Sequence, residues 1–255
     1  MVLYYAEGGS FNNWIKRNNT WYTDLRALKC IVEGLGRIHE KKMVHRDFHI
    51  GNILLRGSDY YSSYISDMGL CGEVGNIDPT NIYGVMPYIA PEVLRGKPYT
   101  QAADIYSFGM VMYFVATGRQ PFSDRAHDHV LALSICNGIR PEITENEAPQ
   151  CYIDLMKKCW DSNPENRPNA TEIMGLLRSF NKTNRSHEIK MQFEKAEEYR
   201  IANLSSIENN DNRSTTHLQA IYTSRLLNPF TENLPKYDDN MGNNSVEITD
   251  FTKFS

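Results

Sequence analysis

Three polar residues close together in the sequence have the types and spacing that phosphate chemistry requires. Asp47 and Asn52 lie in an octapeptide rich in acid, base and amide groups, residues 45–52, which leads directly into the apolar run Ile53–Leu55. Asp67 follows a second β-prone stretch, so a hairpin would bring it back beside Asn52. A carboxylate and an amide oxygen at one strand end form a hard-oxygen site suited to Mg²⁺ and phosphate. Asp47 would then be free to act on a group other than the metal.

Two long helices are predicted around this loop. Thr20 is a suitable N-cap for a helix ending near Lys41, whose apolar residues recur at helical spacing and form one buried stripe. A second helix, Thr100–Thr117, is apolar on most sides, which predicts that it is the central buried helix. Asp104 within it needs hydrogen-bond partners, because an unpaired buried carboxylate is costly. The stripe consists of Leu25, Leu28, Ile31, Val32, Leu35 and Ile38.

The stretches before and between these helices are shorter and more irregular. Val2–Ala6 is β-prone and breaks at Gly8-Gly9, after which Ser10 can cap a short helix through Lys16. Residues 67–92 hold too many glycines and prolines for regular structure, which predicts a long functional loop. Three further helices are predicted over residues 128–136, 151–160 and 169–180.

Toward the C-terminus the composition shifts to Asn, Ser, Thr, Asp and Glu. Residues 187–204 are predicted to form a helix with Ile189, Phe193 and Ala196 on one side. The rest of the chain lacks hydrophobic periodicity, which predicts a mostly disordered tail. Its apolar islands, such as residues 226–230, are interpreted as chance clusters in preference to docking segments.

Composition narrows the class of protein. The chain has 255 residues, 41% of them hydrophobic, which is enough to bury the core of one domain with appendages. A net charge of -4 argues against a nucleic-acid or membrane-surface protein, and no apolar run reaches membrane-spanning length. Five cysteines without metal-ligand spacing favour reduced thiols in the cytoplasm, or secondarily the nucleus. His127 and His129 lack a third ligand and are interpreted as surface histidines.

The polar residues belong to a set of five ordered motifs that resembles part of a protein kinase. The octapeptide matches the His-Arg-Asp catalytic loop with its Asn, and Asp67-Met68-Gly69 matches the metal-binding Asp-Phe-Gly with Met in place of Phe. The residues of these motifs are most similar to those of the tyrosine-kinase-like group of fungal kinases. The remaining three motifs are Ala90-Pro91-Glu92, Asp104-Ile105-Tyr106-Ser107-Phe108-Gly109, and Cys159-Trp160 together with Asn166-Arg167-Pro168.

The resemblance implies a fold and a division of the chain. The fold class is mainly α, a protein-kinase-like large (C-terminal) lobe that is helical with short β-hairpins and is followed by a mostly disordered tail. Residues 1–180 would form the hinge and this lobe of the kinase domain, and residues 181–255 would form the low-complexity tail.

The resemblance also assigns roles in phosphate transfer from ATP to a protein substrate. Asp47 would orient the proton of a substrate hydroxyl, while Asn52 and Asp67 would hold Mg²⁺ against the nucleotide phosphates. The adenine would lie over an apolar floor and bond to the hinge backbone. These adenine-binding residues are Tyr4, Ala6 and Leu54.

Other residues of the resemblance support the site or regulate it. Asp104 would hold the backbone of the catalytic loop, and Arg167 would form a buried ion pair with Glu92. Gly69 would permit the tight turn after Asp67. His45 and Arg46 would be structural members of the loop. Thr80 and Tyr83, in the long loop, are candidate phosphorylation sites, with plain solvated hydroxyls an equal alternative.

The sequence departs from the family pattern in several places. His49 stands where serine/threonine kinases commonly carry a Lys, Val85 stands where they carry a Thr, and Met68 replaces an aromatic residue. The catalytic loop also lacks the Ala-Ala-Arg pattern of tyrosine kinases, which leaves the substrate residue open. No glycine-rich loop or strand Lys precedes Asp47, so the small lobe is expected to be missing and this chain to be weakly active or inactive.

Two alternatives belong to other functional classes. A non-catalytic, pseudokinase-like binding module would use the lobe to contact proteins, including at the face where a small lobe would pack. Such a module has no chemical reason to keep Asp47, Asn52 and Asp67 together, which favours the kinase. A small-molecule phosphotransferase would share the three residues, but Ala90-Pro91-Glu92 and Arg167 favour the protein-kinase version.

Overall fold

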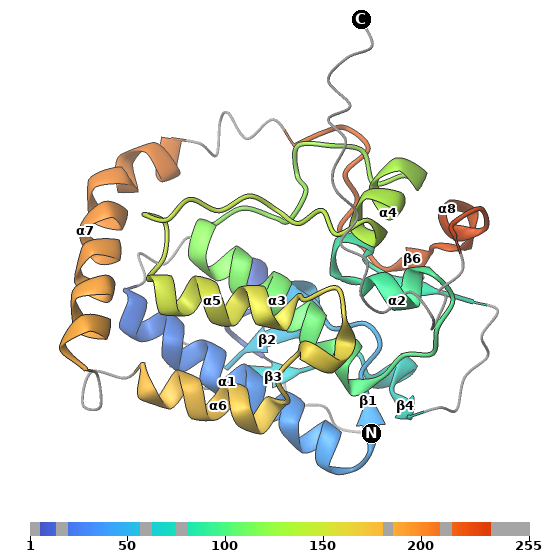
Figure 1. Cartoon of the computed structure of the whole chain (residues 1–255), viewed down its shortest axis with the longest axis horizontal. Helices are drawn as coiled ribbons and strands as arrows, with labels where there is room; N and C mark the ends of the chain where they lie inside the picture. Colours follow the sequence, from blue (N-terminus) through green and yellow to red (C-terminus); the bar gives the residue numbers. More distant parts are fainter. Residues whose placement is uncertain are drawn as a thin grey trace, which may run out of the picture.

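The computed structural model describes residues 6–13, 20–56, 63–74, 81–180, 186–209 and 216–235, which form a predominantly helical molecule (Figure 1). The fold is the one expected for the large lobe of a protein kinase, with helices dominant and strands only two or three residues long. The longer helices are α1 (Trp21–Glu40), α3 (Gln101–Thr117), α4 (His129–Cys136), α5 (Gln150–Cys159), α6 (Ala170–Ser179) and α7 (His187–Asn209). The short ones are α2 (Pro91–Leu94) and α8 (Asn228–Thr231).

Helix α1 begins at the residue that the sequence predicts. The Thr20 hydroxyl accepts a hydrogen bond from the Thr23 amide, and the Thr23 hydroxyl accepts one from the Thr20 amide, so the two side chains cap the helix reciprocally. Five of the six predicted stripe residues are fully or almost fully buried. The helix packs on α6 and on β3 (Ser63–Ile65). Its buried stripe therefore holds one side of the core.

Helix α3 lies at the centre of the molecule, as its uniformly apolar sequence predicts. Residues 103–115 are all buried, and the helix contacts both α1 and α5. Gly118 ends it in the left-handed conformation with φ +72°, which glycine adopts without steric cost. The buried position of α3 makes its one carboxylate, Asp104, a rigid anchor for neighbouring loops.

Within the described residues, the strands form three two-stranded antiparallel ladders. In one, β2 (Ile53–Leu55) pairs with β3 (Ser63–Ile65), with Ile53 opposite Ile65, so the predicted hairpin is present. In the second, β1 (Met43–Val44) pairs with β4 (Gly72–Glu73). In the third, β5 (Tyr83–Gly84) pairs with β6 (Arg225–Leu226), which comes from the far end of the chain.

The N-terminal stretch lies along β2. The Gly8 amide donates to the Leu55 carbonyl at 3.0 Å, and the Leu55 amide donates to the Gly9 carbonyl at 2.9 Å. The helix predicted from Ser10 through Lys16 appears as one 3-10 turn, Phe11–Asn13, beyond which residues 14–19 lie outside the described part of the chain. Phe11 is fully buried and fixes this stretch to the core.

The C-terminal region holds two structured stretches, of which the sequence predicts the first, a helix, and not the second. Helix α7 is longer than the predicted 187–204, and its apolar residues Phe193 and Ala196 are buried against the lobe. Residues 216–235 also pack on the lobe, so the apolar island at 226–230 is a docking segment and not a chance cluster. Hydrophobic periodicity does not reveal this segment, because it is held by hydrogen bonds to backbone groups that are distant in sequence.

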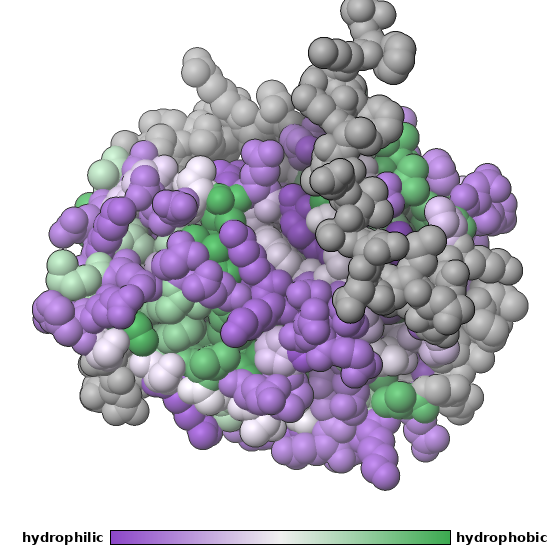
Figure 2. Space-filling model, viewed as in Figure 1, coloured by the Kyte–Doolittle hydropathy of each residue, from purple (hydrophilic) through white to green (hydrophobic). Residues whose placement is uncertain are grey.

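Two surface features complete the fold. Figure 2 shows hydrophilic side chains over most of one face, with apolar residues gathered near the seam where α7 meets α5. In the described ranges, every helix is too short or too polar to cross a membrane.

The expectation that His127 is a surface residue is wrong: its side chain is buried, because the C-terminal segment, residues 216–235, covers it.

Candidate active site

The catalytic loop is held by two backbone hydrogen bonds to one carboxylate of the central helix. Asp104 Oδ2 accepts from the His45 amide at 2.8 Å, and Asp104 Oδ1 accepts from the Arg46 amide at 3.1 Å. His39 Nε2 lies 2.9 Å from the same carboxylate. Hydrogen bonds to a charged acceptor are about twice as strong as neutral ones. Asp104 therefore has the loop-holding contact that the sequence resemblance implies.

His45 links this loop to the strand that carries the second acid. The imidazole is fully buried, its Nε2 lies 3.0 Å from the Ser66 carbonyl, and its Nδ1 accepts from the Asp47 amide at 3.3 Å. These two contacts are satisfied together by a neutral imidazole with its proton on Nε2. Arg46 next to it adopts the left-handed conformation, with φ +71°, and its guanidinium donates to the Glu73 carbonyl.

Asp47 and Asn52 are joined directly. The Asn52 amide nitrogen donates to the Asp47 carbonyl at 2.9 Å and to Asp47 Oδ2 at 3.2 Å, while His49 Nε2 lies 3.6 Å from Asp47 Oδ1. Burial raises the pKa of Asp47, but polar contacts with His49, Ser224 and Asn52 outweigh it and hold the pKa below its usual value. Asp47 is therefore an ionised carboxylate at neutral pH, able to accept a proton from a hydroxyl.

Asp67 is brought beside Asn52 by the hairpin. The Ser66 amide donates to the Asn52 carbonyl at 2.8 Å, and the Ser66 hydroxyl donates to the same oxygen at 3.0 Å. Asp67 follows in the left-handed conformation with φ +57°, which turns its side chain back toward Gly69. A Cβ on Gly69 would lie 3.5 Å from Asp67 Oδ1, so the turn is compact.

The donor set at this point fits Mg²⁺. The Asn52 side-chain nitrogen donates both of its hydrogen bonds to Asp47, so its side-chain oxygen could serve as a cation ligand, and Asp67 could add a carboxylate. In the described ranges, no three His, Cys, Asp or Glu side chains gather as a metal cage. A pair of protein oxygens is the ligand number expected where Mg²⁺ takes its other ligands from phosphate and water.

Two of the three residues predicted to bind adenine lie in the described part of the chain. Ala6 is half-buried, and Leu54 is half-buried in β2, opposite Tyr64 and bridged to Ser10. The stretch that follows Ala6 therefore lies next to the proposed apolar floor. Tyr4, the other predicted adenine contact, lies outside the described residues.

The segment leading to Ala90-Pro91-Glu92 passes close to Asp47. A Cβ on Gly84 would lie 3.4 Å from Asp47 Oδ1 and only 2.6 Å from Ile89 Cδ1, so this position accepts no larger residue without movement. Val85 is buried, and Tyr83 is 42% exposed. Thr80, the other candidate phosphorylation site, lies outside the described residues.

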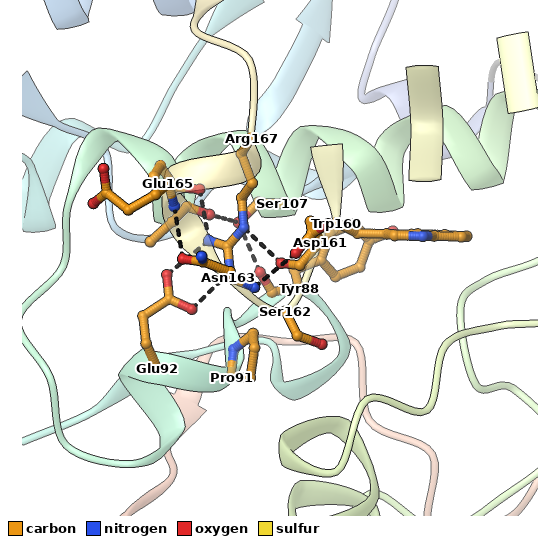
Figure 3. A network of polar contacts seen from close by, with 12 residues as sticks. Tyr88, Pro91, Glu92, Ser107, Trp160, Asp161, Ser162, Asn163, Glu165 and Arg167 are labelled. Atoms are coloured by element: carbon orange, nitrogen blue, oxygen red, sulfur yellow. Dashed lines mark hydrogen bonds and ion pairs between the residues drawn. The ribbon is translucent and has the colours of Figure 1, made fainter. Parts of the chain in front are cut away.

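A buried ion pair fixes the end of this segment (Figure 3). Arg167 Nη1 and Nη2 donate to the two oxygens of Glu92 at 2.7 and 2.8 Å, and the guanidinium also donates to the Asp161 and Ala102 carbonyls. The pair expected from the sequence is therefore present with both side chains inaccessible. Ser107 adds a hydrogen bond from α3 to the Tyr88 carbonyl at 2.7 Å, a contact that its sequence does not signal.

One residue at the site has no signal in the sequence. Ser224, 177 positions further along the chain, interacts with Asp47 and lowers the pKa of that carboxyl. A single serine in a polar segment carries no pattern that could have revealed this contact.

Comparison with known proteins agrees with this geometry. The family model described as "Protein kinase domain" matches residues 1–176, and the chain therefore belongs to the protein kinase family. A mitogen-activated protein kinase kinase kinase 7 of Drosophila melanogaster is 30% identical over 213 residues, which cover 80% of this chain. A putative serine/threonine-protein kinase/receptor of Acanthamoeba polyphaga mimivirus is 32% identical over 180 residues, or 69% of this chain.

The chain spans only part of these relatives. A probable serine/threonine-protein kinase of Dictyostelium discoideum is 31% identical over 147 residues, which cover 58% of this chain and 11% of that protein. The matched part is likewise 11% of the mimivirus protein and 30% of the Drosophila protein. The similarity therefore concerns a kinase domain within longer proteins.

Proposed function

We propose that this chain transfers the γ-phosphate of ATP to a hydroxyl of a protein substrate, with Mg²⁺ held by Asn52 and Asp67. The observation that carries the proposal is the bond of Asn52 to Asp47 on a loop anchored by Asp104, with Asp67 next to the residue whose amide bonds to the Asn52 carbonyl. The names of the similar proteins support serine or threonine as the acceptor.

The residues divide the reaction between them. Asp47, held ionised by its neighbours, would accept a hydrogen bond from the substrate hydroxyl and align it with the phosphate. Bound Mg²⁺ would neutralise phosphate charge as the bond to the leaving group breaks. Asn52 would serve both parts, because its nitrogen donates to Asp47 while its side-chain oxygen would bind the metal.

Nucleotide binding is the first measurement, because the sequence before Asp47 supplies no glycine-rich loop or phosphate-gripping Lys and transfer by this chain alone is expected to be slow. Calorimetry should detect ATP binding that requires Mg²⁺. Asp67→Asn should weaken it at least tenfold, whereas Asp47→Asn should leave it within about threefold, because Asp47 faces the acceptor and not the metal.

Phosphate transfer is the second measurement. In this chain, and in any longer form that carries the glycine-rich loop, both substitutions should abolish transfer to a generic protein acceptor. Mg²⁺-independent binding, or binding that survives Asp67→Asn unchanged, would contradict the proposal and favour a non-catalytic binding module.

A further inference from the structure

The C-terminal segment, residues 216–235, crosses the lobe close to the candidate active site. In Figure 1 it runs past α2 and α4 as β6 and α8, far in sequence from both helices. Helix α8 contacts α4, and the fully buried Leu227 joins the hydrophobic core. We call residues 216–235 the tail segment.

The tail segment is added as a strand beside the loop that precedes Ala90-Pro91-Glu92. Tyr83 lies opposite Leu226, and Gly84 lies opposite Arg225, in an antiparallel ladder. The ladder is extended where the Leu227 amide donates to the Ile82 carbonyl at 2.7 Å and the Ile82 amide donates to Asn228 Oδ1 at 2.8 Å. Addition of an extended strand to an exposed edge is a common way in which proteins bind peptides.

Side chains on both sides of this ladder anchor the segment. The Tyr222 hydroxyl donates to the Pro121 carbonyl at 3.0 Å, and its ring packs edge-on against His127 with centroids 4.8 Å apart. The Arg225 guanidinium donates to the His127 carbonyl at 2.6 Å and stacks on Phe230. These contacts fix the register of the segment over several consecutive residues.

The register places a hydroxyl at the candidate base. Gly84 lies close to Asp47, since its Cβ position is 3.4 Å from Asp47 Oδ1, and Gly84 pairs with Arg225. The residue before Arg225 is Ser224, whose side chain interacts with the Asp47 carboxyl and lowers its pKa. Ser224 is itself exposed to solvent, so a phosphate donor can reach it.

We propose that the tail segment is bound as an intramolecular substrate, with Ser224 as the phosphate acceptor. This inference rests on the proposed kinase function. In the reaction, Ser224 Oγ forms a bond to the γ-phosphorus of ATP, the bond from that phosphorus to the β-phosphate oxygen breaks, and ADP leaves with the electron pair. The hydroxyl proton passes to the Asp47 carboxylate. While the segment is docked, it also excludes other polypeptides from the same strand edge.

Occupancy of the edge is tested without catalysis. The probe is a fluorescent peptide of residues 219–232, added to the full chain. Leu227→Asp places a charge in the buried anchor and should release the segment, so this variant should bind the peptide at least tenfold more tightly than the wild-type chain. Leu218→Asp is the matched control, because Leu218 belongs to the same segment and is fully exposed, and it should bind as the wild type does. Equal binding by wild type and Leu227→Asp would overturn the docking.

A second variant tests the same register if Leu227→Asp does not fold. Tyr83 and Leu226 are opposite each other and both exposed, so the double change Tyr83→Cys and Leu226→Cys should form a disulfide under mild oxidation. The pair Tyr83→Cys and Leu218→Cys should not. The same yield of disulfide from both pairs would contradict the register.

The acceptor is identified by mass spectrometry after incubation with Mg²⁺ and ATP, in this chain and in any longer form with the glycine-rich loop. Phosphate should appear on Ser224, at a fractional rate independent of protein concentration, and should be lost in Ser224→Ala. Transfer to a generic protein acceptor with Ser224 unmodified would overturn the inference but leave the proposed function intact. Absence of Mg²⁺-dependent ATP binding would instead remove the proposed function, and the acceptor role with it.

Discussion

Arg167 and Glu92, 75 residues apart in sequence, form a two-pronged ion pair with N–O distances of 2.7 and 2.8 Å and both side chains buried. The pair joins the loop before α6 to the start of α2, directly after the segment that passes Asp47. The Arg167 guanidinium also lies over the Tyr106 ring of the central helix, 5.3 Å from its centroid. Arg167 thus connects the segment that passes Asp47 to the core of the lobe.

Breaking this pair on one side should be strongly destabilising. Glu92→Gln should lower the free energy of unfolding by about 3 to 5 kcal/mol, because it leaves the Arg167 charge buried without its counter-charge. The control is Glu33→Gln, which removes a solvent-exposed pair with Arg37 and should cost about 0.5 kcal/mol or less. Urea unfolding followed by tryptophan fluorescence measures both. Similar losses for the two variants would contradict a structural role for the buried pair.

Removing the charge of Asp104 should loosen the catalytic loop. Asp104→Asn keeps the shape of the side chain but weakens the bonds from the His45 and Arg46 amides, so the free energy of unfolding should fall by about 1.5 to 3 kcal/mol. Asp154→Asn, on the exposed side of α5, is the matched control and should change stability by less than about 0.5 kcal/mol. Hydrogen exchange at residues 45–47 should accelerate only in Asp104→Asn, and protection unchanged there would contradict the anchoring.

The parts of the fold that sequence predicts are those with local signals. The start of α1 follows from Thr20 and the apolar stripe, and the burial of α3 follows from its composition, because both signals act within a few turns of helix. The hairpin that carries Asp67 also follows from local β-prone stretches. The contact of Asp104 with the loop was implied by the family resemblance alone.

The tail segment could not be predicted because its stabilising partners are distant in sequence. Leu227 is buried, and the backbone of residues 225–227 bonds to residues 82–84, more than 100 positions earlier in the chain. Neither interaction produces a periodic pattern of hydrophobic residues in the sequence. His127 was misjudged for the same reason, since the groups that bury it, such as Ile221, lie in that segment.

Docking of the tail segment should weaken as the pH falls. Burial lowers the pKa of His127 in the folded protein, with Arg225 lowering it further and Asp128 and two backbone contacts opposing the shift. The neutral ring accepts a hydrogen bond from the Ile221 amide at 3.0 Å, while its Nε2 faces the Phe122 carbonyl. A folded pKa below the unfolded value means that the released state binds the proton more tightly, so docking is strongest above about pH 6.5 and is lost progressively below it.

Hydrogen exchange at Ile221 and Leu227 checks this pH dependence. Protection corrected for the intrinsic exchange rate should fall between pH 7.5 and pH 5.5 in the wild type. His127→Gln cannot titrate in this range, so most of the pH dependence should disappear, whatever the variant does to the level of protection. The same pH dependence in both chains would show that another group is responsible.

Helix α7 should act as part of the folded lobe, because it covers residues at the start of α1. Phe193 is buried with its ring edge-on to Trp21, at 5.9 Å between centroids, and Arg200 stacks on the same indole and pairs with Asp24. Phe193→Ala should lower the free energy of unfolding by about 3 kcal/mol, since it leaves a cavity at a junction of three elements. If α7 detaches before the lobe unfolds, the loss of unfolding free energy cannot exceed the free energy with which α7 packs on the lobe. Met191→Ala, on the exposed side of the same helix, should cost under about 0.5 kcal/mol. Equal effects of the two changes, or unaltered hydrogen exchange in α7 of Phe193→Ala, would mean that the helix does not depend on this contact.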